Sequence, residues 1–206
     1  MMDTSLAAAL GIGFLLGIRH ATDADHVAAV STFVSQHRSV ARSCLLGTFW
    51  GVGHTAALLA AALGTITFKL TISPETERGL ERVVALVLVL LGGHVLLRTL
   101  APVRHAHAHV LHTAGRPFLV GLLHGLAGSA ALTLAVVAAI PDPLAGLLYV
   151  LVFGAGSTVG MLVLSGLIAL PFVVTANRTR DLHTAVRALA GIASLLLGLW
   201  LLWELG

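Results

Sequence analysis

The sequence predicts an all-α polytopic membrane protein with six transmembrane helices, and two observations carry that prediction. Of the 206 residues, 57% are hydrophobic and only 10% are charged, and the mean hydropathy is +0.97. Soluble domains carry about 25% charged residues. The apolar residues also gather into runs of the length that a bilayer-spanning helix needs, about 20 residues. A soluble globular domain is therefore excluded.

The predicted spans are separated by short connections that hold most of the charged residues. Their approximate limits are 6–33, 41–68, 82–101, 117–140, 143–174 and 185–204. We expect a single transmembrane domain over residues 1–206. It comprises a first three-helix repeat at about 6–101, a His-rich connecting loop at 102–116 and a second repeat at about 117–204. The start of the chain lacks the basic region of a signal peptide, so we expect the first span to stay in the protein.

The basic residues are distributed unevenly among the connections. The first, third and fifth connections hold eight arginines, whereas the opposite side holds Lys69, Arg78 and Arg82. Cytoplasmic loops are enriched in Lys and Arg, so we expect both termini outside the cytoplasm. These basic loops also account for a pI near 10.0, which favours orientation in a membrane over nucleic-acid binding.

The two halves of the chain resemble each other weakly. The segment from Phe14 to His20 matches that from Phe118 to His124, at an offset of 104 residues, and Gly51–Thr55 matches Gly154–Thr158 at 103. A repeat of three spans must be inverted in the membrane, and inverted repeats are typical of secondary transporters with a site at the repeat interface. The second half lacks the carboxylates of the first, so we expect an asymmetric site built mostly by the first repeat.

Five ionisable side chains lie within eight residues of the first span, at Arg19-His20-Ala21-Thr22-Asp23-Ala24-Asp25-His26. A charge at the centre of a membrane helix costs about 2.5–3.5 kcal/mol on insertion scales, and such residues by default mark a substrate or ion pathway. On a regular helix with about 100° per residue, His20, Asp23 and His26 share one face. Two imidazoles and a carboxylate suit a first-row divalent metal. The alternative is a helix contact in which Arg19 and Asp23 neutralise each other.

Asp25 points about 100° away from His26 on the same regular helix, unless the helix unwinds there. We expect it to accept a hydrogen bond from a histidine of another span, with His54 as the partner. His54 follows Gly51 and Gly53, and such glycines allow close helix approach. His124 and His94 also lie within spans and are candidates for the metal pathway, with ordinary helix packing as the alternative for each.

A short His-rich tract fills the third connection. Its histidines are His105, His107, His109 and His112. Tracts of this kind can collect metal ions, and here we expect a receiving or buffering role outside the transport site. The alternative is a merely polar loop.

The His-x4-Asp-His pattern of His20, Asp25 and His26 resembles the signature helix of the nickel/cobalt transporter family. The segment Phe49-Trp50-Gly51-Val52-Gly53-His54-Thr55 is similar to that family's second motif, an aromatic pair followed by Gly-His-Ser/Thr. By this resemblance the metal-site positions are His20, Asp23, Asp25, His26 and His54. The family's later Asp-Thr-rich motifs have no counterpart after residue 115, which places the chain among compact relatives. The His-rich loop resembles that of nickel/cobalt efflux proteins.

The sequence therefore predicts alternating-access transport of Ni²⁺ and/or Co²⁺ in the inner membrane of a prokaryotic cell. The ion is expected as substrate, with no permanently bound cofactor, no enzymatic activity and a homo-oligomer as a compatible assembly. Two alternatives stay open, metal efflux and an accessory membrane protein that serves metalloenzyme assembly. A minor alternative is a membrane acyltransferase in which His20 and Asp25 form the catalytic pair, because the spacing of the two residues also fits that class.

Overall fold

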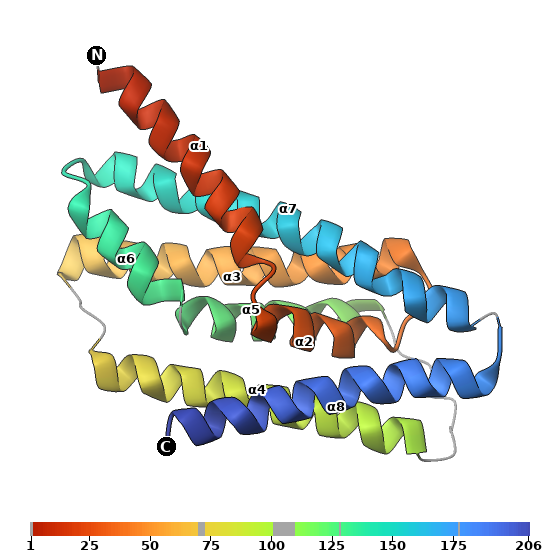
Figure 1. Cartoon of the computed structure of the whole chain (residues 1–206). Helices are drawn as coiled ribbons and strands as arrows, with labels where there is room; N and C mark the ends of the chain where they lie inside the picture. The colour runs from red at the N-terminus through yellow and green to blue at the C-terminus, as the bar shows by residue number, and fades with distance from the viewer. Residues whose placement is uncertain (1, 70–72, 101–109, 128, 177) are drawn as a thin grey trace.

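The computed structural model describes residues 2–69, 73–100, 110–127, 129–176 and 178–206, and the described part is helical (Figure 1). Its helices are α1 (Met2–His20), α2 (Ala24–Val34), α3 (Val40–Phe68), α4 (Pro74–Leu100), α5 (Val110–Leu126), α6 (Ser129–Ala139), α7 (Pro143–Ala176) and α8 (Arg180–Glu204). Four of them, α3, α4, α7 and α8, are long and apolar enough to cross a membrane. The predicted class, an all-α membrane protein with several membrane-spanning helices, is confirmed.

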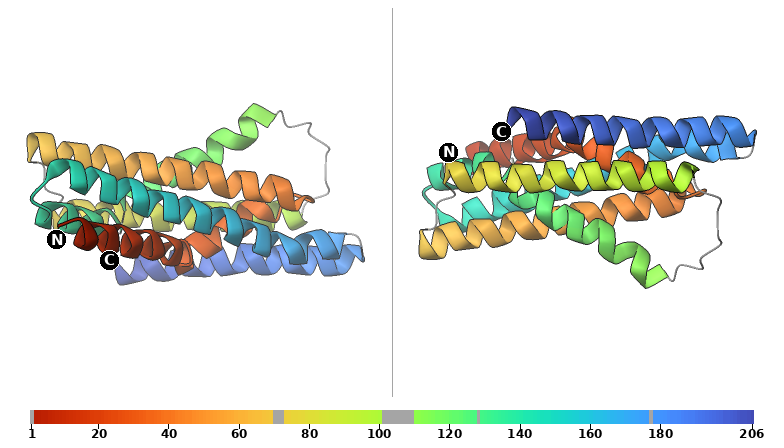
Figure 2. Two further views of the ribbon diagram at one scale, coloured as in Figure 1. Left: turned by 90° about the horizontal axis from the view of Figure 1, so that it is seen from above. Right: turned by 90° about the horizontal axis from the view of Figure 1, so that it is seen from below.

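The first and fourth predicted spans are each divided into two helices. The run 6–33 becomes α1 and α2, and the run 117–140 becomes α5 and α6. Along Figure 1, α1 leads from the end that holds both termini toward the middle of the bundle, and α2 continues toward the opposite end. Figure 2 shows the same bundle from above and below, with both termini at one end.

The break between α1 and α2 overturns the regular helix expected for this stretch. Asp23 has an extended backbone, with φ −63° and ψ 147°, and immediately precedes α2. Thr22 turns its hydroxyl back to the Arg19 carbonyl at 2.6 Å, and Asp25 accepts from the backbone N–H of His26 at 2.9 Å. These short polar side chains compete with the helical hydrogen bonds, so the helix ends where they cluster.

Most of the packing between helices joins α3 to α7 and α5, α1 to α7, and α4 to α8. Glycines allow the closest of these contacts. A Cβ added at Gly17 of α1 would overlap the backbone oxygen of Phe153, and one added at Gly121 of α5 would overlap that of Trp50. Small residues of this kind let membrane helices approach backbone to backbone.

The contacts of α1 on α7 recur between α5 and α3 at nearly the offset of the sequence repeat. Gly17 and Gly121 are 104 residues apart, and their partners Phe153 and Trp50 are 103 apart. Where α3 meets α7, the hydroxyls of Thr55 and Thr158 lie 3.4 Å apart, and these two residues are themselves 103 positions apart. The long helices of the two halves therefore cross at corresponding residues.

Candidate metal centre

Four histidines from four helices meet beside the α1–α2 break. His20 ends α1, His26 lies in the first turn of α2, His54 is in α3 and His124 is in the last turn of α5. The ring centroid of His20 is 4.6 Å from that of His26 and 5.0 Å from that of His54. The His26 and His124 centroids are 5.0 Å apart.

Two sets of three side chains have ligand atoms within 4.8 Å of one another. The first set is His20, His26 and His54, and the second is Asp25, His26 and His124. His26 belongs to both sets and is only 2% exposed. The break is what makes this possible, because it turns the start of α2 so that Asp25 and His26 both face the neighbouring helices.

Each of the two aspartates orients a histidine. Asp23 Oδ2 lies 2.8 Å from His20 Nδ1, and Asp25 Oδ1 lies 3.0 Å from His26 Nδ1. An ionised carboxylate can only accept a hydrogen bond, so Nδ1 is the donor in both pairs, and in a neutral imidazole Nε2 then keeps its lone pair. Metal-binding histidines commonly have their second nitrogen held by a carboxylate in this way.

The free nitrogens of the cluster are buried without hydrogen-bond partners. Among the described residues, ten buried side-chain atoms lack a partner, and six of them are imidazole nitrogens of His20, His26, His54 and His124. Buried polar atoms are normally paired, so an exception calls for an explanation such as a bound ion. Neutral imidazole nitrogens together with carboxylates fit a divalent transition metal.

Asp25 does not contact His54 as the sequence suggested. It contacts His26, and its second oxygen lies 3.6 Å from Nε2 of His124. Within the described segments Arg19 and Asp23 form no ion pair, and Asp23 pairs with His20 instead. The charge-paired helix contact considered as the alternative is therefore absent.

The remaining histidines singled out in the sequence lie elsewhere. His94 is half-buried in α4 and belongs to neither set. His105, His107 and His109 fall outside the described residues, and the side chain of His112 in α5 is likewise not described.

One residue at the centre was not singled out from the sequence as a site residue. Trp50 packs with its ring centroid 5.9 Å from that of His26 and 5.0 Å from that of His124. Its place in the aromatic pair before Gly51 was the available signal. The indole is 1% exposed and packs from α3 against His26 of α2 and His124 of α5.

Comparison with known proteins gives one full-length similarity. The urease accessory protein UreH of Bacillus sp. (strain TB-90) is 39% identical over 218 residues, which covers 100% of this chain and 95% of that protein. No protein-family model matches the chain. No solved structure matches it.

Proposed function

This chain belongs to the UreH family of urease accessory proteins, and from that premise we propose that it transports Ni²⁺, with Co²⁺ as a second candidate ion. The observation that carries the proposal is the cluster of buried imidazoles with unpartnered nitrogens inside an apolar helical bundle. Intramembrane ionisable residues by default mark an ion pathway. Imidazole and carboxylate ligands suit both ions, and the general affinity order does not choose between them.

In this proposal the ion exchanges its waters for imidazole nitrogens as it enters the centre. His26 is the shared ligand, with His20 and His54 on one side and Asp25 and His124 on the other. Asp23 holds His20 in place from a more exposed position, with 53% of its side chain accessible. The ion is substrate in this scheme, and the protein needs no resident cofactor.

The proposed mechanism is alternating access between two inverted repeats of three membrane crossings each. The α1–α2 and α5–α6 pairs would each form one broken crossing, which gives six crossings in all. The recurring contacts at offsets of 103 and 104 support this proposal. Broken helices in corresponding positions of two repeats are where secondary transporters bind their ions. We place both termini outside the cytoplasm, as the distribution of arginines indicates.

The second candidate is metal delivery to an enzyme under assembly, which the name of the urease accessory relative favours. Efflux is the same chemistry in the opposite direction. The acyltransferase alternative receives no support from the geometry, since His20 pairs with Asp23 and Asp25 pairs with His26.

The test is a Ni²⁺ and Co²⁺ flux assay on full-length protein in liposomes, with both orientations measured. We expect flux in the wild type and its loss in His26→Ala, whereas His94→Ala, a histidine outside both sets, keeps it. Binding without flux in the wild type would favour the delivery role. A wild type that neither binds nor moves either ion would refute the proposal.

A further inference from the structure

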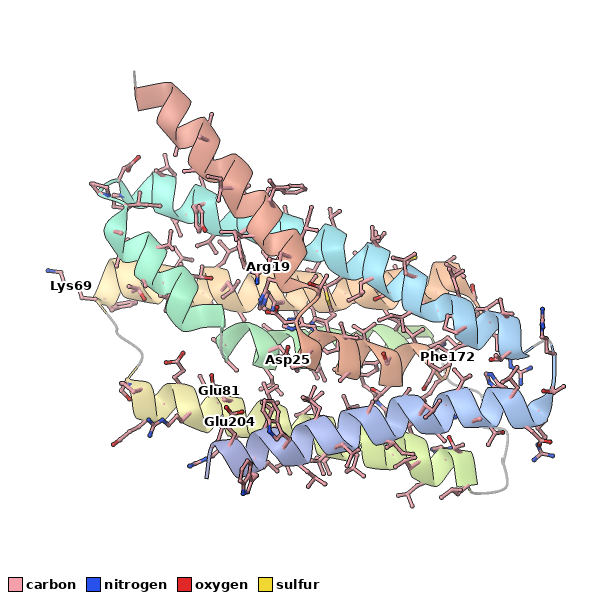
Figure 3. All side chains as sticks on the ribbon, viewed as in Figure 1. Arg19, Asp25, Lys69, Glu81, Phe172 and Glu204 are labelled. Atoms are coloured by element: carbon pink, nitrogen blue, oxygen red, sulfur yellow. The ribbon has the colours of Figure 1, made fainter. Side chains whose placement is uncertain are left out.

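The α1–α2 break opens into a cavity of about 720 Å³ that reaches the last turn of α8. His20, Asp23, Asp25 and His26 line it beside the break. Two carboxylates outside the proposed centre line it as well, Glu81 of α4 and Glu204 of α8. Figure 3 shows both on the α4–α8 pair, on the side toward the start of α2 where Asp25 lies.

The charge of this cavity favours a cation. The described residues that line it include four carboxylates and, as the one strongly basic group among them, the guanidinium of Arg19. Exposure falls from Glu204, which is exposed, through the half-buried Glu81 and Asp25 to the buried His26, while Asp23 is a further exposed carboxylate of the same cavity. A cleft lined by one sign of charge raises the local concentration of the opposite ion and its rate of binding.

The two glutamates are held together by the residues beside them. Arg82 Nε donates to the backbone oxygen of Leu205 at 3.1 Å, and its Nη2 donates to the same oxygen. This contact joins the first part of α4 to the end of α8. Arg82 forms no ion pair with Glu81. Within the segments that the structure describes, neither Glu81 nor Glu204 forms an ion pair.

A second observation at the base of the same cavity points to a ligand. His26 lines the cavity, is 2% exposed and has an Nε2 atom without any hydrogen-bond partner. An unpartnered imidazole nitrogen beside an acidic cavity fits a cation better than an anion or a neutral solute. The two outer carboxylates, Glu81 and Glu204, and the unpartnered His26 therefore line one cavity.

We propose that Glu81 and Glu204 form an outer capture site for a hydrated divalent cation, from which the ion passes along the cavity to His26. This inference rests on the proposed metal function and adds the side from which the ion enters the centre. Carboxylates suit ions that keep their water, whereas imidazoles suit Ni²⁺ and Co²⁺ after water has been lost. In this proposal Glu81 and Glu204 set the association rate of the ion, and the histidines set the equilibrium affinity.

The test is the rate of Ni²⁺ association with full-length protein in detergent, followed by stopped-flow tryptophan fluorescence. Trp50 contacts two of the histidines, so we expect Ni²⁺ at the centre to quench it. The variant Glu81→Gln/Glu204→Gln should bind about tenfold more slowly at low salt, at the lower end of the range for electrostatic steering. Its equilibrium affinity should change less than its association rate.

Two variants control for folding and for general surface charge. Glu81→Asp/Glu204→Asp retains the charge and should keep most of the rate. Glu75→Gln removes an exposed acid of α4 that does not line the cavity and should bind at the wild-type rate. At about 1 M salt, where charges are screened beyond about 3 Å, the difference between wild type and the glutamine variant should vanish.

Equal low-salt rates for the wild type and the double glutamine variant would overturn the capture site and leave the metal function standing. An equal slowing by Glu75→Gln would also overturn it, because the effect would then come from surface charge in general. A wild type that takes up no Ni²⁺ in this assay would refute the proposed function itself, and this inference with it.

Discussion

Asp25→Asn should weaken Ni²⁺ binding more than Asp23→Asn, although a regular helix would predict the opposite order. On a regular helix Asp23 shares the face of the two histidines and Asp25 does not. In the structure Asp25 contacts two imidazoles, with one oxygen 3.0 Å from His26 Nδ1 and the other 3.6 Å from His124 Nε2. Asp23 contacts His20 alone, and 53% of its side chain is exposed.

The magnitudes follow from these environments. A hydrogen bond to a charged group contributes about 1.5–3 kcal/mol, and about 1.4 kcal/mol corresponds to a tenfold change in affinity. We therefore expect Asp25→Asn to weaken Ni²⁺ binding by about 10–100-fold. Contacts of a charged side chain that is half exposed to water, as Asp23 is, contribute only about 0.2–1 kcal/mol, so Asp23→Asn should weaken Ni²⁺ binding by no more than about fivefold.

Isothermal titration of the purified variants with Ni²⁺ measures both effects. Asparagine has nearly the same volume as aspartate, so we expect both variants to keep their helices. Circular dichroism of each variant checks this. A larger loss for Asp23→Asn than for Asp25→Asn would refute this reasoning. It would show that Asp23 is a direct ligand and that the stretch behaves as one continuous helix when the ion is bound.

Three further predictions concern the packing, the His-rich loop and the topology. Gly17→Ala should lower the melting temperature, because the added Cβ would meet the backbone of Phe153 and overpacking costs about 1–3 kcal/mol. Gly11→Ala on the same helix is the control, because a Cβ there has open space and the change should be neutral or slightly stabilising. Replacing His105, His107, His109 and His112 together should leave Ni²⁺ binding at the centre intact in titrations, and complete loss would show that the site is misplaced. A reporter fused after Gly206 should report a location outside the cytoplasm, and activity only inside would contradict the charge-based orientation.

The helical class and the apolar parts of the long helices could be predicted from the sequence because they follow from hydrophobicity. The expected spans 41–68 and 143–174 correspond closely to α3 (Val40–Phe68) and α7 (Pro143–Ala176). The break after His20 could not be predicted in the same way. Averaged over residues 6–33, hydropathy predicts one span, and the ionisable residues within it do not by themselves indicate where a helix ends. The side-chain competition at the end of α1 depends on local hydrogen bonds at Thr22 and Asp25.

The sequence singled out the histidines and aspartates that meet at the candidate centre, but neither Trp50 nor the pairing of Asp25 with His124. The sequence singles out His20 and His26, but their ring centroids come within 4.6 Å of each other only because the break separates α1 from α2. The contact of Asp25 with His124 depends instead on how near α5 comes to α2 and α3. That approach is set by Gly121 and Gly125, whose added Cβ atoms would overlap backbone atoms of α3. Glu81 and Glu204 were invisible as a pair for the same reason, since they come from opposite halves of the chain.

The asymmetry of the site can be tested at two residues that the repeat makes equivalent. His54 and Ser157 are 103 positions apart, and both are fully buried with unpartnered polar atoms. If His54 of the first repeat supplies a ligand and Ser157 of the second does not, His54→Ala should weaken Ni²⁺ binding at least tenfold, as expected for the loss of a direct ligand. Ser157→Ala should change binding by less than about twofold. It should not lower the melting temperature, because a buried hydroxyl without a partner costs about 1–3 kcal/mol that alanine avoids. A loss of affinity in Ser157→Ala as large as that in His54→Ala would show that both halves supply ligands, and the proposed centre would then have to include α7.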